Sequence, residues 1–227
     1  MYEKLRSILL RKGLHITLCF VLLVPYTQLG SSIGIDPLAY YALLAAAAAT
    51  LNAYQIKRSL LISKISVKAI LDRFSASLTT IPEVASIMLR VEKLVEDLLR
   101  DVEREYERRS GYVGLTFGAI GTLTSYALFA DHTLLGVLAL MVVDPIAAVV
   151  GYKWGRLRIG ENRRSIEGSV AAAASYLMLL VALGYDLPYS LILSIVASLT
   201  EAISVEDNLL IPLVVSAASY ALYTLSL

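Results

Sequence analysis

Apolar residues along the chain gather into runs of about 17–20 residues, separated by shorter polar segments. A helix of this length and composition can span the hydrocarbon core of a bilayer. Seven runs can be placed, at residues 15–32, 37–56, 112–130, 133–151, 168–184, 187–203 and 209–226. The pattern predicts an all-α fold: a polytopic membrane helix bundle of about seven transmembrane helices, forming a single integral membrane domain over residues 1–227.

Two of these runs are less regular than the others. The run 15–32 loses apolar character toward its end, and the run 187–203 contains Glu201. The alternative interpretation is a large soluble protein with buried helices. We disfavour it because 57% of the residues are hydrophobic and the mean hydropathy is +0.69, which leaves little polar surface to solvate the folded chain.

The distribution of charge predicts the orientation of the bundle. If the N-terminus is cytoplasmic and the runs alternate in direction, all 20 Lys and Arg residues lie inside: four before residue 13, eleven within 57–109 and five within 153–164. The outer turns carry only Asp36, Asp131 and Asp186, besides His132. This arrangement obeys the positive-inside rule. We therefore expect a cytoplasmic N-terminus and a C-terminus outside.

The long polar segment 57–111 is predicted to be a cytoplasmic helical insertion between the second and third spans. Its second half combines a helical apolar period with opposite charges three or four residues apart, which favours an exposed amphipathic helix. The apolar face comprises Met88, Val91, Leu94, Val95, Leu98, Leu99 and Val102. A helix lying on the membrane or on the protein itself is the simpler interpretation, and a coiled-coil contact that forms a homodimer is the alternative.

Charge and cysteine content narrow the possible functions. A formal net charge of +1 gives no indication of a nucleic-acid partner. Cys19 is the single cysteine, so the sequence has neither a disulfide framework nor a cysteine-based metal site. The basic N-terminus is followed by no small-residue cleavage pattern, and we expect the first run to be retained as a span.

Basic residues mark the start of the first span. Arg11 and Lys12 precede the apolar run, and His15 lies one turn farther along. Anchoring of the helix at the membrane interface explains the two cations most simply. His15 lies within the start of the apolar run, so we treat it as a candidate functional residue.

The stretch MVVDPIAAVVGYKWGR, residues 141–156, contains a carboxylate inside an apolar run. Asp144 lies about two helical turns before Gly151. An ionised carboxylate at that depth requires a basic side chain or a metal ion as its partner, and protonation is the alternative. Pro145 removes a backbone donor and is expected to bend or open the helix there.

The inner loop 151–169 concentrates glycines and cations. Backbone amides together with Arg and Lys side chains are suited to binding a polyphosphate, and the N-terminus of the following helix adds donors for an anion. We expect Gly151, Gly155 and Gly160 to give the loop backbone freedom. The candidate phosphate-binding residues here are Gly151, Lys153, Gly155, Arg156, Arg163, Arg164, Ser165 and Gly168, and Glu167 stands at the exit of the loop.

An acidic cluster lies where the run 187–203 meets the run 209–226. It contains Glu201, Glu206, Asp207 and Asn208. Oxygen ligands of this kind suit Mg²⁺, which binds one or two carboxylates together with phosphate oxygens and water. An ordinary acidic turn that caps the last helix is the alternative. Because the topology brings these cations and carboxylates to one cytoplasmic face, the sequence favours phosphoryl or nucleotidyl transfer.

The order of these elements resembles a family of enzymes: RKxxH, an Asp followed by small residues and Gly, GR, (K/R)SxEGS, and an acidic E…EDN-L-x-x-P element. The family comprises the polytopic lipid kinases that include dolichol kinase, phytol kinase and the CTP-dependent diacylglycerol kinase of yeast. The resemblance covers nearly the whole chain apart from 57–105. It implies transfer of the terminal phosphate of CTP, or of another nucleoside triphosphate, to a lipid alcohol with the help of Mg²⁺ or another divalent cation.

The resemblance also implies roles for particular residues. Asp144, Glu167 and His15 would be catalytic, and Asp144, Glu201, Asp207 and Asn208 would bind the metal ion. The nucleotide and phosphate site would comprise Arg11, Lys12, Gly151, Gly155, Arg156, Arg164, Ser165 and Gly168. To these the basic character of the inner loop adds Lys153 and Arg163. The chain departs from the family pattern at Val143, where Gly is usual, and at Arg164, where Lys is usual.

Two other functions fit parts of this pattern. A CTP-dependent lipid-phosphate nucleotidyltransferase that makes a CDP-lipid would use similar clusters on the same face. A transporter would place ionisable groups near the midplane of two related halves, whereas here they gather at one face. The acceptor is expected to enter from the bilayer, and polyprenols of the dolichol type, geranylgeraniol, phytol and diacylglycerol are all candidates, with an isoprenoid alcohol favoured.

Overall fold

The computed structural model describes residues 2–61, 113–159 and 164–225. The chain separates into two compact units, Met1–Ala48 with Gly114–Leu227, and Ala49–Val113. Most of the second unit lies outside the described residues, and so does the predicted amphipathic helix within the insertion 57–111. The prediction of a single membrane domain with a helical insertion therefore stays a prediction.

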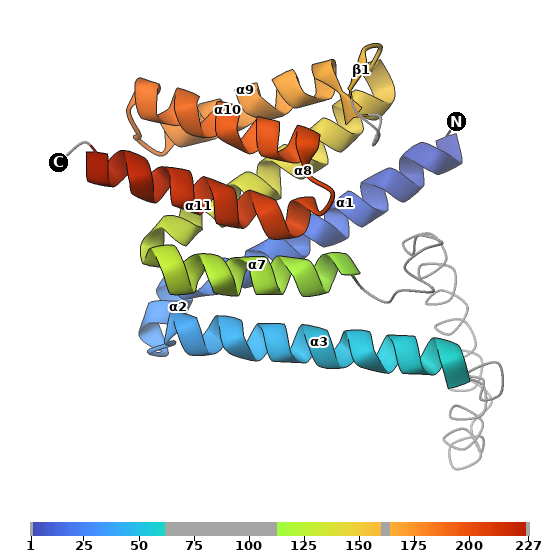
Figure 1. Ribbon diagram of the computed structural model, residues 1–227, viewed down its shortest axis with the longest axis vertical. Helices are drawn as coiled ribbons and strands as arrows, with labels where there is room; N and C mark the ends of the chain where they lie inside the picture. The colour runs from blue at the N-terminus through green and yellow to red at the C-terminus, as the bar shows by residue number, and fades with distance from the viewer. Residues whose placement is uncertain (1, 62–112, 160–163, 226–227) are drawn as a thin grey trace, which may run out of the picture. The chain divides into compact units, whose positions relative to one another are not determined.

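The described residues are mostly helical, which agrees with the predicted all-α class (Figure 1). The helices are α1 (Tyr2–Leu22), η1 (Val24–Tyr26), α2 (Gln28–Ser32), α3 (Pro37–Leu61), α7 (Val113–Phe129), η2 (Ala130–His132), α8 (Thr133–Trp154), α9 (Ile166–Ala182), α10 (Leu187–Ile203) and α11 (Asp207–Leu225). Between α8 and α9 lies a short antiparallel hairpin of β1 (Arg158–Ile159) and β2 (Arg164–Ser165), which the apolar pattern did not predict.

The predicted helix at 15–32 is wrong in its bounds. Helix α1 begins at Tyr2 and ends at Leu22, after which the chain turns through η1 and the short helix α2. Pro25 lies in this turn, and its missing N–H and fixed φ stop the helix from continuing. The other predicted runs correspond to α3, α7, α8, α9, α10 and α11 to within a few residues.

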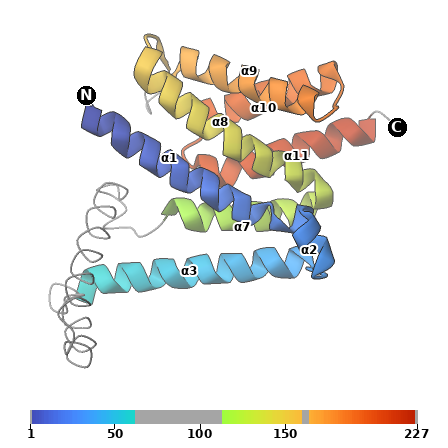
Figure 2. The ribbon, with the colours of Figure 1, turned by 180° about the vertical axis from the view of Figure 1, so that it is seen from behind.

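Helix α8 lies at the centre of the first unit, in contact with α1, α9, α10 and α11. Figures 1 and 2 show that successive helices reverse direction, with α1 lying across α8. The start of α1, the end of α8, the hairpin, the start of α9, the end of α10 and the start of α11 therefore gather at one end, which we call the hairpin end. The η2 segment and the α9–α10 turn lie at the opposite end, the η2 end.

Side chains of α10 are distributed in the opposite way to those of an amphipathic helix in water. Beside the apolar Leu193 and Ala197, its buried residues are Ser190, Ser194, Ser198 and Thr200, which have hydroxyl groups, and Glu201. Its exposed residues include Leu187, Leu191, Ile192, Ile195, Leu199 and Ile203. A helix that packs on a water-soluble core buries its large apolar side chains instead.

Hydroxyl groups also bind backbone carbonyls between helices. The Tyr41 hydroxyl donates to the carbonyl of Leu22 and the Tyr40 hydroxyl donates to that of Val21, both at 2.8 Å. These carbonyls belong to the last turn of α1, where no intrahelical donor is present. The Ser198 hydroxyl likewise donates to the carbonyl of Ser169 at 2.7 Å, joining α10 to α9.

Two stretches of the described residues are long and apolar enough to cross a membrane by length and composition, Val113–Trp154 and Asp207–Leu225. The first is 42 residues long and contains α7, η2 and α8. Helices α9 and α10 are apolar and shorter. Seven membrane crossings were predicted from the sequence, and that number stays a prediction.

Candidate functional site

A buried ion pair joins α1 to α8 at the hairpin end. The Lys12 Nζ atom donates to both carboxylate oxygens of Asp144, each at 2.6 Å. The two side chains are 15% and 5% exposed. The cation required by a deeply placed Asp is thus a basic side chain of the first helix, so Lys12 does more than anchor a helix end. Helix α8 stays helical through Pro145, so of the two expected effects of the proline, a bend or an opening of the helix, the opening does not occur.

His15 and Cys19 extend this pair along α1. The His15 Nε2 atom lies 3.1 Å from the carbonyl oxygen of Leu140 and 3.5 Å from Asp144 Oδ2. The Cys19 Sγ atom lies 3.6 Å from the same nitrogen and is buried. We call Lys12, His15, Cys19 and Asp144 the α1–α8 cluster. Sequence reasoning did not select Cys19, although its spacing of four residues from His15 places both on one helix face.

A second cluster forms around Arg164 at the end of the hairpin. The Arg164 Nη1 atom donates to Glu201 Oε1, and its Nη2 atom donates to Asp207 Oδ2 at 3.0 Å. The three residues come from β2, α10 and α11, and we call them the Arg164 cluster. The planar fork of arginine reaches two carboxylates at once, which lysine would do less well. Arg164 also interacts electrostatically with Asp144, so the two clusters are neighbours.

The carboxylates provide a partial set of ligands for a divalent cation. Glu201 is 4% exposed, and its Oε2 atom is buried without a hydrogen-bond partner among the described residues. Within the same part of the chain, no three His, Cys, Asp or Glu residues stand close enough to hold a metal ion alone. Mg²⁺ commonly binds one or two carboxylates together with phosphate oxygens and water. Glu201 and Asp207 are ligands of that chemical kind, and in the structure both are paired with Arg164.

The start of α9 presents a capped helix N-terminus beside Arg164. Ser165 is the N-cap, and its hydroxyl oxygen accepts a hydrogen bond from the Gly168 amide at 3.0 Å. Glu167 Oε1 accepts hydrogen bonds from the amides of Arg156 and Leu157 at 3.0 and 3.2 Å. Glu167 therefore fixes the loop after α8.

Three of the predicted glycines allow close packing between α8 and α9. A Cβ atom on Gly168 would lie 2.5 Å from the carbonyl oxygen of Ala147, and one on Gly151 or Gly155 would lie 2.7 Å from the Ser165 hydroxyl oxygen. None of the three has a positive φ. The expectation that Gly151 and Gly155 supply backbone freedom was wrong, because the space beside them is already occupied. Gly160 lies outside the described residues.

Other predicted phosphate ligands lie at the same end in separate environments. The Arg11 Nε atom donates to the Ser7 carbonyl of its own helix at 3.3 Å. The Lys153 Nζ atom lies 4.4 Å from the centre of the Trp154 ring, in a cation–π contact. Arg156 has an exposed side chain. The structure therefore does not bring these three cations into the Arg164 cluster.

Two predicted site residues, Asn208 and Arg163, and one that was not predicted, Arg158, complete the comparison with the sequence. A Cβ atom on Gly114 would lie 3.0 Å from Asn208 Nδ2, so the Asn208 side chain lies against α7, and its predicted role as a metal ligand stays a prediction. Arg163 lies outside the described residues. Sequence reasoning did not select Arg158, whose Nη2 atom donates to the Gly151 carbonyl at 3.2 Å. The position of Arg158 within the basic loop was the feature of the sequence from which it could have been selected.

Comparisons with known proteins give one distant relative. The chain is 30% identical over 127 residues to "Uncharacterized protein MJ1137" of Methanocaldococcus jannaschii, a match that covers 54% of this chain and 64% of that protein. The chain thus spans less than two thirds of the length of the relative it matches. It matches no protein-family model and no solved structure.

Proposed function

We propose that the chain is an integral membrane lipid kinase. It transfers the terminal phosphate of CTP, or of another nucleoside triphosphate, to an isoprenoid alcohol of the polyprenol, geranylgeraniol or phytol type. The observation that carries the proposal is the juxtaposition of the α1–α8 cluster and the Arg164 cluster with the N-terminus of α9. Together they place two cations, three carboxylates and oriented backbone donors at one end of an apolar helix bundle.

A membrane location is supported by the distribution of polar groups. Helix α10 exposes Leu191, Ile195 and Leu199 while it buries Ser194 and Glu201. Lipid solvates apolar side chains, so helices in a bilayer associate through small residues and buried hydroxyl groups. In this proposal α1, α3 and α7–α11 are the seven spans. The hairpin end is cytoplasmic because every Lys and Arg lies in an inner segment or in the part of α1, α3 or α8 that adjoins one, and the C-terminus lies outside.

Lys12 and Arg164 are the proposed ligands of the triphosphate. Each cation holds carboxylates in the structure. When the triphosphate binds, each can exchange a carboxylate oxygen for a phosphate oxygen. The released carboxylate then pairs with the divalent cation, so no charge is left without a partner. The N-terminus of α9 adds the positive end of a helix dipole. Positioning and charge neutralisation of this kind are the main requirements of phosphoryl transfer.

The proposed transfer is a direct displacement at the terminal phosphorus. The lipid hydroxyl oxygen forms a bond to phosphorus, the bond between phosphorus and the bridging oxygen breaks, and the nucleoside diphosphate leaves. Asp144 accepts the hydroxyl proton or holds the cation that neutralises the phosphates. His15, whose Nε2 atom is 3.5 Å from Asp144 Oδ2, can take that proton onward. Glu201 and Asp207 would hold Mg²⁺, which supplies charge neutralisation at the phosphate oxygens when it is bound.

A phosphate-transfer assay tests the proposal. Purified full-length chain in liposomes is supplied with Mg²⁺ and CTP or ATP labelled at the terminal phosphate, together with geranylgeraniol, a longer polyprenol or diacylglycerol. We expect label in an isoprenoid alcohol, with a nucleoside diphosphate as the second product. Asp144→Asn is expected to abolish transfer. The control is Asp36→Asn, which changes an acidic residue that caps α3 at the η2 end and should retain transfer.

Two results would overturn the kinase. In the first, no alcohol becomes labelled with any nucleotide, and pyrophosphate is released when a lipid phosphate is supplied. This result would identify the nucleotidyltransferase that makes a CDP-lipid. No reaction with either class of lipid, in chain shown to be folded by circular dichroism, would remove the phosphotransferase interpretation. Turnover by Asp144→Asn close to that of the unmodified chain would remove the proposed role of Asp144.

A further inference from the structure

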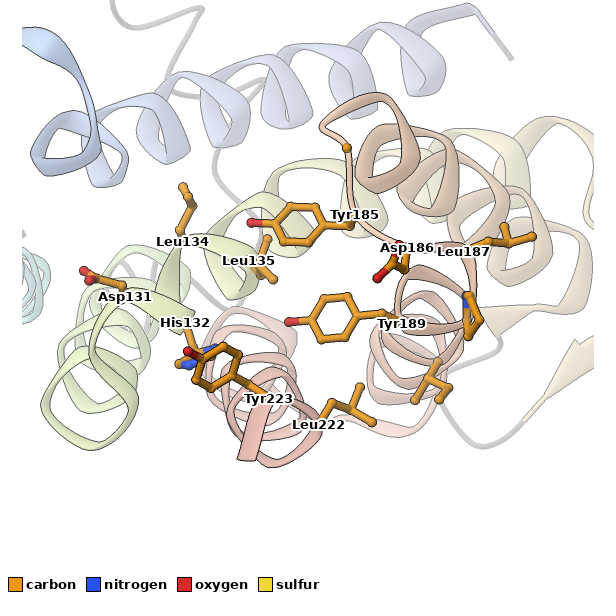
Figure 3. Close-up of a pocket in the computed structure, with 13 residues that line it drawn as sticks. Asp131, His132, Leu134, Leu135, Tyr185, Asp186, Leu187, Tyr189, Leu222 and Tyr223 are labelled. Carbon is orange, nitrogen blue, oxygen red and sulfur yellow. The ribbon is translucent and has the colours of Figure 1, made fainter. Parts of the chain in front are cut away.

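An open pocket of about 970 Å³, which we call the cavity, lies at the η2 end of the first unit, away from both clusters described above. It is formed where α8 begins, where α9 turns into α10 and where α11 ends (Figure 3). Cavities of this size commonly hold small ligands when a few polar groups converge on an apolar wall. The proposed kinase site makes no use of this cavity.

Aromatic rings form one wall of the cavity. Tyr185 and Tyr189 stack with their centroids 5.6 Å apart and their planes at 19°, and Figure 3 shows both rings pointing toward the side formed by η2 and α8. The Tyr189 hydroxyl is 2.7 Å from Ser219 Oγ, which is itself 2.7 Å from His132 Nδ1. This chain of contacts fixes the Tyr189 ring before any ligand binds. The His132 ring also packs against Tyr223, with centroids 5.4 Å apart.

The charge at the cavity is negative. Asp131 and Asp186 line it, and neither carboxylate forms a salt bridge or a hydrogen bond with the part of the chain that the structure describes. Residues 110–152 and 165–227 contain no Lys or Arg. Burial lowers the pKa of His132, in the turn between two predicted spans, below its ordinary value, so its imidazole is neutral at pH 7 and does not offset the carboxylates.

We propose that this cavity binds an organic ammonium cation, with the stacked Tyr185 and Tyr189 rings as its face and Asp186 as its counter-ion. Anions are disfavoured because, among the described residues, carboxylates carry the full charges that line the cavity. A small hard cation would prefer several converging oxygen ligands, whereas the wall here is aromatic. Rings beside a carboxylate suit alkylated ammonium groups, which are large, weakly hydrated and attracted to π faces.

Binding can be measured by titration calorimetry on the full chain in an uncharged maltoside detergent. The probes are choline and its neutral carbon isostere, in which a quaternary carbon replaces the nitrogen. We expect saturable binding of choline and none of the isostere at the same concentrations. Equal binding of both would show an apolar cavity only and would overturn the proposal, as would the absence of saturable heat with choline.

Matched variants of Tyr185 separate the contribution of the aromatic ring to binding from that of its hydroxyl group. Tyr185→Phe keeps the π face and is expected to bind choline as the unmodified chain does, whereas Tyr185→Leu should weaken binding about two- to fivefold. Asp186→Asn should weaken it by a similar factor through the lost counter-ion, and Asp36→Asn at the same end should not change it. Equal affinity of Tyr185→Leu and Tyr185→Phe would contradict the proposed role of the ring.

The same ammonium group can come from a lipid headgroup or from a free amine. The two sources are separated by repeating the titration in nanodiscs of phosphatidylglycerol and of phosphatidylcholine. If the headgroup is the ligand, choline headgroups already occupy the cavity and the heat with free choline disappears in phosphatidylcholine. If a free amine is the ligand, the two discs give the same affinity. Either result supports the ammonium site, and this test is independent of any kinase activity.

Discussion

The ion pair of Lys12 and Asp144 should contribute strongly to stability, and a double-mutant cycle measures its contribution. Lys12 Nζ lies 2.6 Å from each carboxylate oxygen, so the Coulomb attraction is about 6 kcal/mol at an effective dielectric constant of about 20. Desolvation of the two charges offsets much of this gain. Removal of one partner, however, leaves a buried charge uncompensated, and this costs about 3–5 kcal/mol.

The variants are Lys12→Met, Asp144→Asn and the combination of both, with equilibrium unfolding followed in mixed micelles. We expect each single variant to be destabilised by about 3–5 kcal/mol. The double variant should be destabilised by about as much as one single variant or less, because it leaves no unpaired charge. Lys153→Met is the matched control: Lys153 is exposed, so this change should stay within about 0.5 kcal/mol.

Additivity in the cycle would refute the reasoning. If the double variant loses the sum of the two single losses, the two side chains do not interact in the folded protein. A loss below about 1 kcal/mol in both single variants would show that the pair is solvated and contributes little, as surface pairs do. Either result would also remove the structural basis for Lys12 as a phosphate ligand.

Three further substitutions, two of them with a matched control, test the hairpin end. Arg164→Lys keeps the charge and loses the fork between Glu201 and Asp207, so it should lower both the affinity for nucleotide and the free energy of unfolding, the latter by about 1–3 kcal/mol; unchanged values of both would contradict the shared contact. Gly168→Ala places a Cβ atom 2.5 Å from the Ala147 carbonyl oxygen, and should lower the free energy of unfolding, measured by thermal unfolding, by about 1–3 kcal/mol. In the control Gly13→Ala the Cβ atom meets nothing within 4 Å, so this change should stabilise α1 by up to about 1 kcal/mol. Ser165→Ala removes the N-cap of α9 and should cost about 1 kcal/mol; Ser165→Asn should lose less, since Asn also caps helices.

The positions of most helices could be predicted from the sequence, because the length and apolar content of a segment are local properties. The runs 133–151 and 187–203 agree with α8 and α10 to within three residues. The need of Asp144 for neutralisation, by a cation or by protonation, also followed from its position alone, since a carboxylate in an apolar run must be neutralised. The meeting of the basic start of α1 with the basic loop after α8 at one end also followed from alternation of the runs.

The partners of the charged residues depended on how the helices pack. Asp144 pairs with a lysine 132 residues away, a choice fixed by the contact of α1 with α8, and local periodicity carries no information about such contacts. The same holds for the Arg164 fork and for Gly168, whose missing side chain admits the Ala147 carbonyl. Chain order places charges along helices, but only the packing of helices against one another determines which charges meet, because ion pairs form across space and over a few ångströms.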